Sequence, residues 1–203
     1  MGLPQDIKRY TPQEYYVLER EAEYHSDYFG GEIFAMAGGG TKHSLIKVNI
    51  TGELRSKLKG KRCGAYDSDQ RLKVKSNGLR CYPDASVYCG PLDYDADDAQ
   101  AETATNPTIL FEVLSKSTEA YDRGLKAESY RSIESLKAYV LVSQDRPHVE
   151  LQERLSDGTW RLSWAAGLDG VLRLPDIEVE LSLAELYERV DFSMPASEVG
   201  TPA

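Results

Sequence analysis

The chain has 203 residues, of which 41% are hydrophobic and 28% charged, a composition typical of one globular domain of ordinary size. No apolar run approaches the ~18 residues that a membrane span requires, so no membrane partner is expected. The formal net charge of -9 argues against a protein that grips nucleic-acid phosphates tightly, although residues 42–80 are distinctly basic.

The first ten residues contain Lys8 and Arg9 but no apolar segment behind them. Neither a signal peptide nor a transit peptide is therefore expected, and a cytoplasmic location follows by default. Three cysteines, Cys63, Cys81 and Cys89, cannot all pair within one chain, and their spacing lacks the close doublets of a structural zinc site. We expect reduced, mostly packed thiols.

The N-terminal part predicts a helix, a hairpin and a second helix. A threonine-proline pair opens a helix over residues 11–22, because threonine caps free amide groups and proline suits the first helical position. Residues 24–29 and 32–36 flank a Gly-Gly pair that suits a tight hairpin turn. Apolar residues then recur every four positions and predict an amphipathic helix over residues 42–59, with His43 in its first turn.

Two strand-like runs follow, residues 63–74 and residues 79–88. An Asn-Gly turn between them favours a hairpin. Asp84 is expected inside the second strand, directly after a proline. Residues 91–106 are acidic and poor in large apolar side chains, so they predict a solvated loop or a mobile lid.

Residues 108–114 form an almost continuous apolar run, typical of a strand that is covered on both faces. Glu112 is its only charged residue. A helix over residues 121–133 and a buried strand over residues 137–142 come next. A strand, helix and strand in this order imply a parallel crossover.

The C-terminal part predicts a second hairpin and a last helix. Residues 149–155 and 159–164 flank an Asp-Gly turn, and a Ser-x-x-Glu capping box opens a helix from Ser182 to about residue 190. The tail, residues 193–203, is rich in small residues and proline, and we expect it to be disordered.

These elements predict a single α/β domain over residues 11–192, after an N-terminal segment of residues 1–10. Its centre is a mixed β-sheet flanked by helices, extended by hairpins near both ends. Within the sheet Glu112 needs a partner, because burying an ionised carboxylate costs several kcal/mol unless something pairs with it. A bound cation, a salt bridge or a strand end that reaches water would each satisfy it.

Asp84 favours the cation. Two carboxylates from neighbouring strands can meet at one edge of a sheet, where they present the hard oxygen ligands that Mg²⁺ prefers. We therefore predict a metal-binding carboxylate pair formed by Asp84 and Glu112.

The order of these segments resembles the PD-(D/E)XK nuclease superfamily, and most closely its Uma-type branch of restriction-endonuclease-like proteins. The resemblance runs from about residue 10 to residue 190 and rests on Gly31-Glu32-Ile33, His43, Pro83-Asp84, Glu112-Val113-Leu114-Ser115-Lys116-Ser117-Thr118 and Tyr121-Asp122-Arg123-Gly124-Leu125-Lys126. A Pro-Asp pair alone is weak, since a second one occurs at residues 175–176, so the joint order carries the weight. The resemblance implies a restriction-endonuclease-like core and Mg²⁺-dependent hydrolysis of DNA phosphodiester bonds.

The resemblance also implies roles for single residues. Asp84, Glu112 and the carbonyl group of Val113 would hold Mg²⁺, with Mn²⁺ as a substitute. Glu32 would supply a further carboxylate, unless it is only a solvated hairpin charge. His43 would contact phosphate or position water, unless it is an ordinary packed or surface histidine.

One position departs from the superfamily pattern. The lysine expected two residues after the acid is Leu114 in this chain. Lys126 is the candidate replacement, because some branches of the superfamily supply the lysine from the following helix, and Lys116 is a weaker one. Asp122 lies four residues before Lys126, so the alternative is an exposed ion pair worth a few tenths of a kcal/mol.

Asp69, expected in the strand paired with that of Asp84, is a weaker candidate ligand, and Ser115 and Ser117 are expected to cap the following helix. DNA is the expected partner, bound weakly or transiently because of the acidic balance, and a homodimer is expected by analogy with restriction enzymes. Two alternatives stay open. One is a catalytically decayed nuclease fold that binds nucleic acid or protein, and the other is a metal-dependent phosphodiesterase acting on another substrate.

Overall fold

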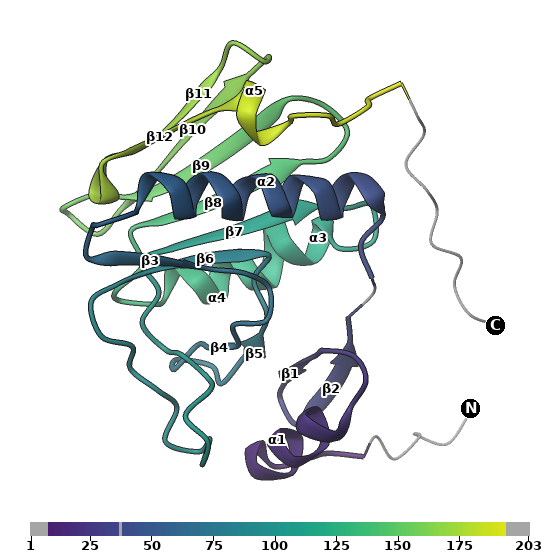
Figure 1. Cartoon of the computed structure of the whole chain (residues 1–203). Coiled ribbons are helices and arrows are strands. Elements are labelled where there is room, and N and C mark those ends of the chain that lie inside the picture. Colours follow the sequence, from purple (N-terminus) through teal and green to yellow (C-terminus); the bar gives the residue numbers. More distant parts are fainter. Residues whose placement is uncertain (1–7, 37, 194–203) are drawn as a thin grey trace.

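The computed structural model describes residues 8–36 and 38–193 and shows a central sheet between helical layers (Figure 1). Its helices are α1 (Pro12–Glu21), α2 (Thr41–Lys57), α3 (Glu119–Tyr121), α4 (Ala127–Arg131) and α5 (Leu183–Leu186), with a π-helical turn η1 (Asp122–Lys126) and a 3-10 turn η2 (Pro175–Ile177). Its strands are β1 (Ser26–Phe29), β2 (Glu32–Ala35), β3 (Cys63–Tyr66), β4 (Leu72–Lys73), β5 (Arg80–Cys81), β6 (Ala85–Cys89), β7 (Ile109–Leu114), β8 (Ala138–Ser143), β9 (His148–Arg154), β10 (Trp160–Ala166), β11 (Val171–Leu174) and β12 (Val179–Ser182).

The central sheet has six strands in the order β10-β9-β8-β7-β6-β3. β7 and β8 pair in parallel, as the strand, helix and strand order predicts, and the other neighbours pair antiparallel. The predicted α/β class with a central mixed sheet is confirmed.

β7 packs against a different layer on each face, which explains its continuous apolar sequence. Phe111 and Val113 belong to a core shared with α2 and the β11–β12 hairpin. Leu110 and Leu114 belong to a second core beneath α4. Glu112 therefore points toward the α4 layer, since alternate side chains of a strand point to the same face.

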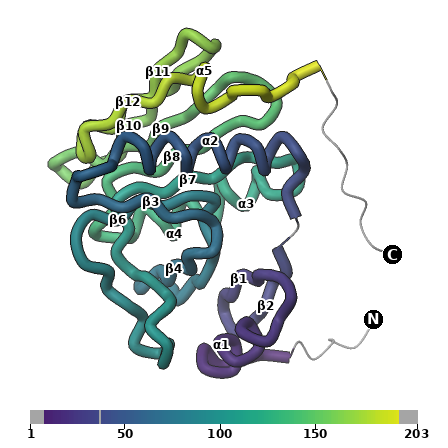
Figure 2. Tube along the Cα trace, in the orientation of Figure 1, coloured from purple at the N-terminus to yellow at the C-terminus, as the bar shows by residue number. Residues whose placement is uncertain are grey.

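A smaller sheet, in the order β2-β1-β5-β4, lies beside the central one and packs against α1 (Figures 1 and 2). Tyr15 and Tyr16 of α1 form a buried cluster with Tyr28 of β1. The Tyr10 N–H, just before α1, donates to the carbonyl of Gly31 at 2.8 Å. The N-terminal helix and hairpin are thus one packed unit.

The run predicted as one strand over residues 79–88 is divided between the two sheets. β5 pairs with β1 and β4, whereas β6 pairs with β3 and β7. The chain changes sheet at Pro83 and Asp84, because proline has no N–H with which to continue a ladder. Asp84 therefore directly precedes β6, and the prediction that it lies inside a strand is wrong.

Residues 91–106 form an irregular, largely exposed loop, as predicted, but two of its acidic side chains are buried and anchor it to the molecule. Asp95 is 4% exposed and accepts a hydrogen bond from the Arg80 guanidinium at 2.8 Å. Asp98 is also buried and pairs with Arg71 at 3.7 Å. The acidic residues of this loop thus neutralise arginines that lie inside the protein.

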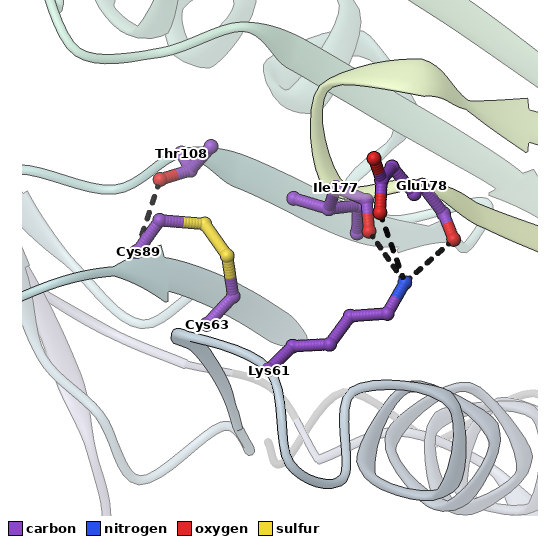
Figure 3. The surroundings of a disulfide bond; sticks show 6 residues. All are labelled: Lys61, Cys63, Cys89, Thr108, Ile177 and Glu178. Carbon is purple, nitrogen blue, oxygen red and sulfur yellow. Dashed lines mark hydrogen bonds and ion pairs between the residues drawn. A yellow bond between two sulfur atoms is a disulfide. The ribbon is translucent and has the colours of Figure 1, made fainter.

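Cys63 and Cys89 face each other across β3 and β6 and form a disulfide, with their Cα atoms 4.0 Å apart (Figure 3). The prediction of reduced thiols is wrong for this pair and holds for Cys81, which is free and buried. Sequence spacing could not reveal the pair, because the register of β3 against β6 sets it. Beside it, the Lys61 ammonium donates to the carbonyl of Glu178 at 2.7 Å and joins the end of α2 to the β11–β12 hairpin (Figure 3).

The run predicted as one strand over residues 63–74 is likewise divided, into β3 of the central sheet and β4 of the smaller sheet, and the β11–β12 hairpin was not predicted. The other predicted helices and strands are confirmed with shifted ends. The helix predicted over residues 121–133 is α3, η1 and α4 in succession. The last helix, α5, is shorter than predicted, and the Ser182 hydroxyl caps it by accepting from the Ala184 N–H at 3.2 Å. Residues 194–203 of the tail predicted to be disordered, and residues 1–7, lie outside the described residues.

In the part of the chain that the structure describes, no helix is long and apolar enough to cross a membrane. The cytoplasmic location stays a prediction.

The Arg80–Asp95 pair gives a first testable prediction. Asp95→Ala would leave the guanidinium of Arg80, which is 2% exposed, without its main carboxylate, at a cost of about 3 kcal/mol in the free energy of unfolding. Glu180→Ala is the control, because Glu180 pairs with Arg173 at the surface, where such a pair is worth ~0 to 1 kcal/mol. Urea unfolding of both variants measures the difference, and equal losses would contradict the anchoring role of Asp95.

Candidate active site

Asp84 lies at the bend before β6, where three groups converge on its carboxylate. Oδ2 accepts a hydrogen bond from the Val113 N–H of β7 at 2.7 Å and lies 3.2 Å from His43 Nε2. Oδ1 lies 3.4 Å from the ammonium nitrogen of Lys47. These partners outweigh the cost of burial and hold the pKa of Asp84 below its usual range, so its carboxylate is ionised.

His43 reaches Asp84 because the preceding glycine loop makes room for its ring. A Cβ atom at Gly39 would lie 2.8 Å from the Cγ atom of His43, too close for any other residue without a shift. Gly39 is therefore needed for the site, whereas the sequence indicated only a break between two elements. The placement of His43 in the first turn of α2 is confirmed.

Glu112 lies on the opposite face of the sheet and is 3% exposed. Its Oε1 accepts hydrogen bonds from the Lys126 ammonium at 3.0 Å and from the Tyr130 hydroxyl at 2.8 Å. Asp122 lies 3.5 Å from the same ammonium group. The predicted helical face that carries Asp122, Lys126 and Tyr130 is thus turned toward Glu112.

The Asp122–Lys126 ion pair is buried, so the alternative of an exposed pair is wrong. Both side chains are at most 5% exposed. The π-helical turn η1 spans the two residues, and such turns often occur at functional sites. Lys126 therefore reaches the acid of β7 from the following helix, while Leu114, at the position of the expected lysine, packs in the apolar core.

The buried carboxyl groups near Lys126 carry more negative charge than one lysine can balance. Burial, with Asp122 and Asp84 nearby, raises the pKa of Glu112 to about 8. Burial likewise raises the pKa of Asp122 and that of Asp27 in β1. The surrounding acids in turn raise the pKa of Lys126 well above its ordinary value despite its burial, so this lysine stays charged.

Asp27 is a site residue that the sequence analysis missed. It is 5% exposed, and its Oδ2 accepts a hydrogen bond from the Tyr121 hydroxyl at 3.1 Å. The positive charge of Lys126 and the negative charge of Asp122 both act on its pKa, which places it beside the same cluster. Its position in an early hairpin was the only available signal, because nothing in the sequence marks one hairpin acid over another.

Other candidates are not brought into the site. Glu32 is partly exposed on β2 and pairs with Arg9 at 3.5 Å. Asp69 does not lie in a strand paired with that of Asp84, as predicted, but in a turn, where its side chain is 80% exposed and lies 3.3 Å from His25. Lys116 is exposed beyond the end of β7.

Ser115 and Ser117 stand at the end of β7, as expected. The Ser115 hydroxyl accepts a hydrogen bond from the Thr118 N–H at 3.3 Å, which supports the turn into α3. The side chain of Thr118, the N-cap residue of α3, makes no capping hydrogen bond with that helix. Of the predicted capping role, only the hydrogen bond of Ser115 in the turn before α3 is present.

The carboxyl groups fit a small divalent cation. Within residues 8–36 and 38–193, no three His, Cys, Asp or Glu side chains lie close enough together to hold a metal ion. Mg²⁺ needs only one or two carboxylates, because waters complete its shell. Asp27 Oδ1 is buried without a hydrogen-bond partner, and Asp122 Oδ1 has only the Lys126 ammonium at 3.5 Å, so the cluster has oxygen atoms that a cation could use.

The Val113 carbonyl is available on the same side. In an extended strand the N–H and C=O groups of one residue point to the same edge. The Val113 N–H donates to Asp84, so the Val113 carbonyl also points toward the β6 side of β7, just beyond the first residue of β6. The Asp84 carboxylate and the Val113 carbonyl therefore lie on the same side of β7.

The chain is similar to known proteins along most of its length. The family model described as "Uma2: Putative restriction endonuclease" matches residues 12–185. Two uncharacterized proteins of Synechocystis sp. (strain ATCC 27184 / PCC 6803 / Kazusa) are similar along most of their length. One, slr1290, is 32% identical over 182 residues, which are 90% of this chain and 93% of that protein. The other, sll1609, is 29% identical over 157 residues, or 77% and 88% of the two chains.

A solved structure has a similar fold. It is described as "a putative nuclease belonging to DUF820" from Anabaena variabilis ATCC 29413. It matches with a TM-score of 0.66 at 18% identity and covers 85% of this chain and 92% of its own. At this identity the likeness concerns the fold alone.

The raised pKa of Glu112 predicts how stability depends on pH. The folded protein keeps a proton on Glu112 up to about pH 8, whereas the unfolded chain loses it near the ordinary value of 4.5. The folded state therefore binds more protons within this window, and the free energy of unfolding falls as pH rises through it, by up to about 1.4 kcal/mol per pH unit.

Glu112→Gln tests this assignment, because glutamine keeps an oxygen acceptor for Lys126 and Tyr130 but cannot ionise. Urea unfolding between pH 5 and pH 8, with a chelator present, should show a shallower loss of stability in the variant. The same slope in both proteins would rule out Glu112 as the titrating group.

Proposed function

Because the chain belongs to the Uma2 family, described as "Putative restriction endonuclease", we propose that it is a Mg²⁺-dependent endonuclease that hydrolyses DNA phosphodiester bonds. One observation carries the proposal. The Val113 N–H ties Asp84 to β7 at the residue next to Glu112, while Lys126 contacts Glu112 from the following helix. Two acids and a lysine from three separate segments are thus linked through adjacent residues of β7, with the two acids on opposite faces of the sheet.

Asp84, Glu112 and the Val113 carbonyl would hold the ion. A bound Mg²⁺ would polarise a phosphate oxygen and lower the pKa of a water molecule. Asp84 is suited to this task because it is ionised, and the excess of buried acid around Lys126 favours a cation nearby. Asp27, rather than the predicted Glu32, would supply any additional carboxylate, since it is buried beside Lys126 and keeps one oxygen unpaired.

Lys126 would act in place of the lysine that Leu114 replaces. Its ammonium group is positively charged and held at 3.0 Å from Glu112. In that position it would orient the attacking water for in-line attack on phosphorus and offset the charge that develops on the phosphate. His43 would act as a positioning residue, because it contacts Asp84 Oδ2 and limits how that carboxylate can turn.

DNA would bind weakly or transiently. Two arginines of the basic stretch over residues 42–80 are used inside the molecule, where Arg71 and Arg80 pair with acids of the loop over residues 91–106. Lys61 donates to backbone carbonyls near η2. Arg55, Lys59, Arg62 and Lys75 are exposed and remain able to release counterions from DNA, whereas the net charge of -9 opposes tight binding. A homodimer stays part of the proposal by analogy only.

A decayed nuclease that only binds nucleic acid or protein is the second candidate, favoured by Leu114 and by the lack of three converging ligands among the described residues. Calorimetric titration with Mn²⁺ separates the two, since a decayed site should bind no ion. A metal-dependent phosphodiesterase with another substrate would bind Mn²⁺ but cleave small phosphodiesters in preference to DNA.

The two acids give a direct test of the reaction. Asp84→Asn and Glu112→Gln should each lower Mg²⁺-dependent nicking of supercoiled plasmid by about 100-fold or more, because each replaces a carboxyl group that the bound ion would keep ionised with a neutral amide of the same shape. Asp69→Asn is the matched control, since Asp69 is exposed and away from the site. Alanine is unsuitable, because Glu112→Ala would leave Lys126 buried without its nearest partner. Wild-type nicking in the double variant Asp84→Asn, Glu112→Gln would overturn the proposal.

The two candidate lysines can be distinguished in the same assay. Lys126→Met should lower nicking by about 100-fold, because general acid-base and electrostatic assistance of this kind contributes about that much. It should leave Mn²⁺ binding measurable by calorimetry. Lys116→Met should have little effect, since Lys116 is exposed. Loss of activity in Lys116→Met with full activity in Lys126→Met would transfer the role to Lys116.

A further inference from the structure

Two side chains of α2 cover both oxygens of Asp84. The Lys47 ammonium nitrogen lies 3.4 Å from Oδ1, and His43 Nε2 lies 3.2 Å from Oδ2. The two residues are four apart on α2, so their side chains share one face of the helix. A metal ion that binds Asp84 through Oδ1 must therefore displace Lys47 or share the oxygen with it.

Lys47 is the partner that can leave. Its side chain is 27% exposed, against 13% for His43. Lysine carries its charge on a long flexible stem, whereas the ring of His43 is held against Gly39. Lys126, the other lysine near the carboxylates, is 5% exposed and bonded to Glu112, so it cannot move without breaking buried contacts.

We propose that Lys47 competes with the metal ion for Asp84 and, once displaced, neutralises a phosphate of the bound DNA. This inference rests on the proposed function. A divalent ion would bring two charges to the carboxylate, whereas the ammonium brings one at 3.4 Å, so Coulomb attraction favours the ion. Breaking the Lys47–Asp84 pair opposes it and lowers the metal affinity that is observed.

The competition links metal binding to substrate binding. The displaced ammonium group would stay close to Asp84, because the Lys47 side chain is attached to α2. DNA brings a phosphate to the same place, where it would replace Asp84 as the partner of Lys47. A metal ion would then improve DNA binding through the chain's own lysine as well as through direct contact.

Calorimetric titration with Mn²⁺ tests whether Lys47 competes with the metal ion for Asp84. Lys47→Met should bind Mn²⁺ about tenfold more tightly than the wild type at low salt, and the gain should shrink at high salt because the pair is partly exposed. Lys47→Arg keeps the charge and should resemble the wild type. Lys57→Met is the matched control, since Lys57 lies on the same helix, is 32% exposed and pairs with Glu53 and Glu185 instead.

DNA binding at saturating Ca²⁺, measured by fluorescence anisotropy, tests whether the displaced Lys47 contacts a DNA phosphate. Lys47→Met should bind DNA several-fold more weakly, with the slope of log affinity against log salt reduced by about one, as expected for one lost phosphate contact. Lys57→Met should keep the wild-type slope. An unchanged slope in Lys47→Met would overturn the transfer to phosphate.

The Mn²⁺ titration also separates this inference from the proposed function. If the wild type binds Mn²⁺ and Lys47→Met binds it with the same affinity, the competition is overturned and the proposed nuclease stands. If neither the wild type nor any variant binds Mn²⁺, the proposed function and this inference both fall.

Discussion

The Lys126 ammonium group is buried beside more carboxyl groups than one positive charge can neutralise. Glu112 accepts its hydrogen bond, Asp122 lies 3.5 Å away, and Asp27 is close enough for its pKa to respond. Without these carboxyl groups the buried Lys126 charge would have no partner, and with all of them ionised the negative charge would exceed the positive charge. β7, η1 and β1 are therefore held around a cluster that needs a proton or a further cation to balance it.

The two carboxylates of the site are neutralised from opposite faces of the sheet by two lysines of different freedom. Lys47 approaches Asp84 from α2, whereas Lys126 approaches Glu112 from η1. The buried lysine is fixed by its hydrogen bond, and the half-buried one can exchange its partner. A nuclease of the proposed kind needs both properties, because one lysine must stay beside the attacked phosphate while the ion's place on Asp84 is cleared.

Most secondary structure could be predicted from the sequence, because it depends on local patterns. The four-residue spacing of Ile46, Ile50 and Leu54 gives α2, and the apolar run around Glu112 gives β7. The predictions failed where pairing decides the outcome. The strand over residues 79–88 is split because its halves pair in different sheets, and the Cys63–Cys89 disulfide forms because β3 and β6 align those positions.

The sequence by itself determined which carboxylates to suspect, since Glu112 interrupts an apolar strand and Asp84 follows a proline. It also indicated that Lys126 could stand in for the lysine missing at Leu114. Only the tertiary structure decided that Asp27 joins the cluster and Glu32 does not, although both lie in the same hairpin. The physical reason is that side-chain burial and charge pairing depend on neighbours distant in sequence, which a local pattern does not encode.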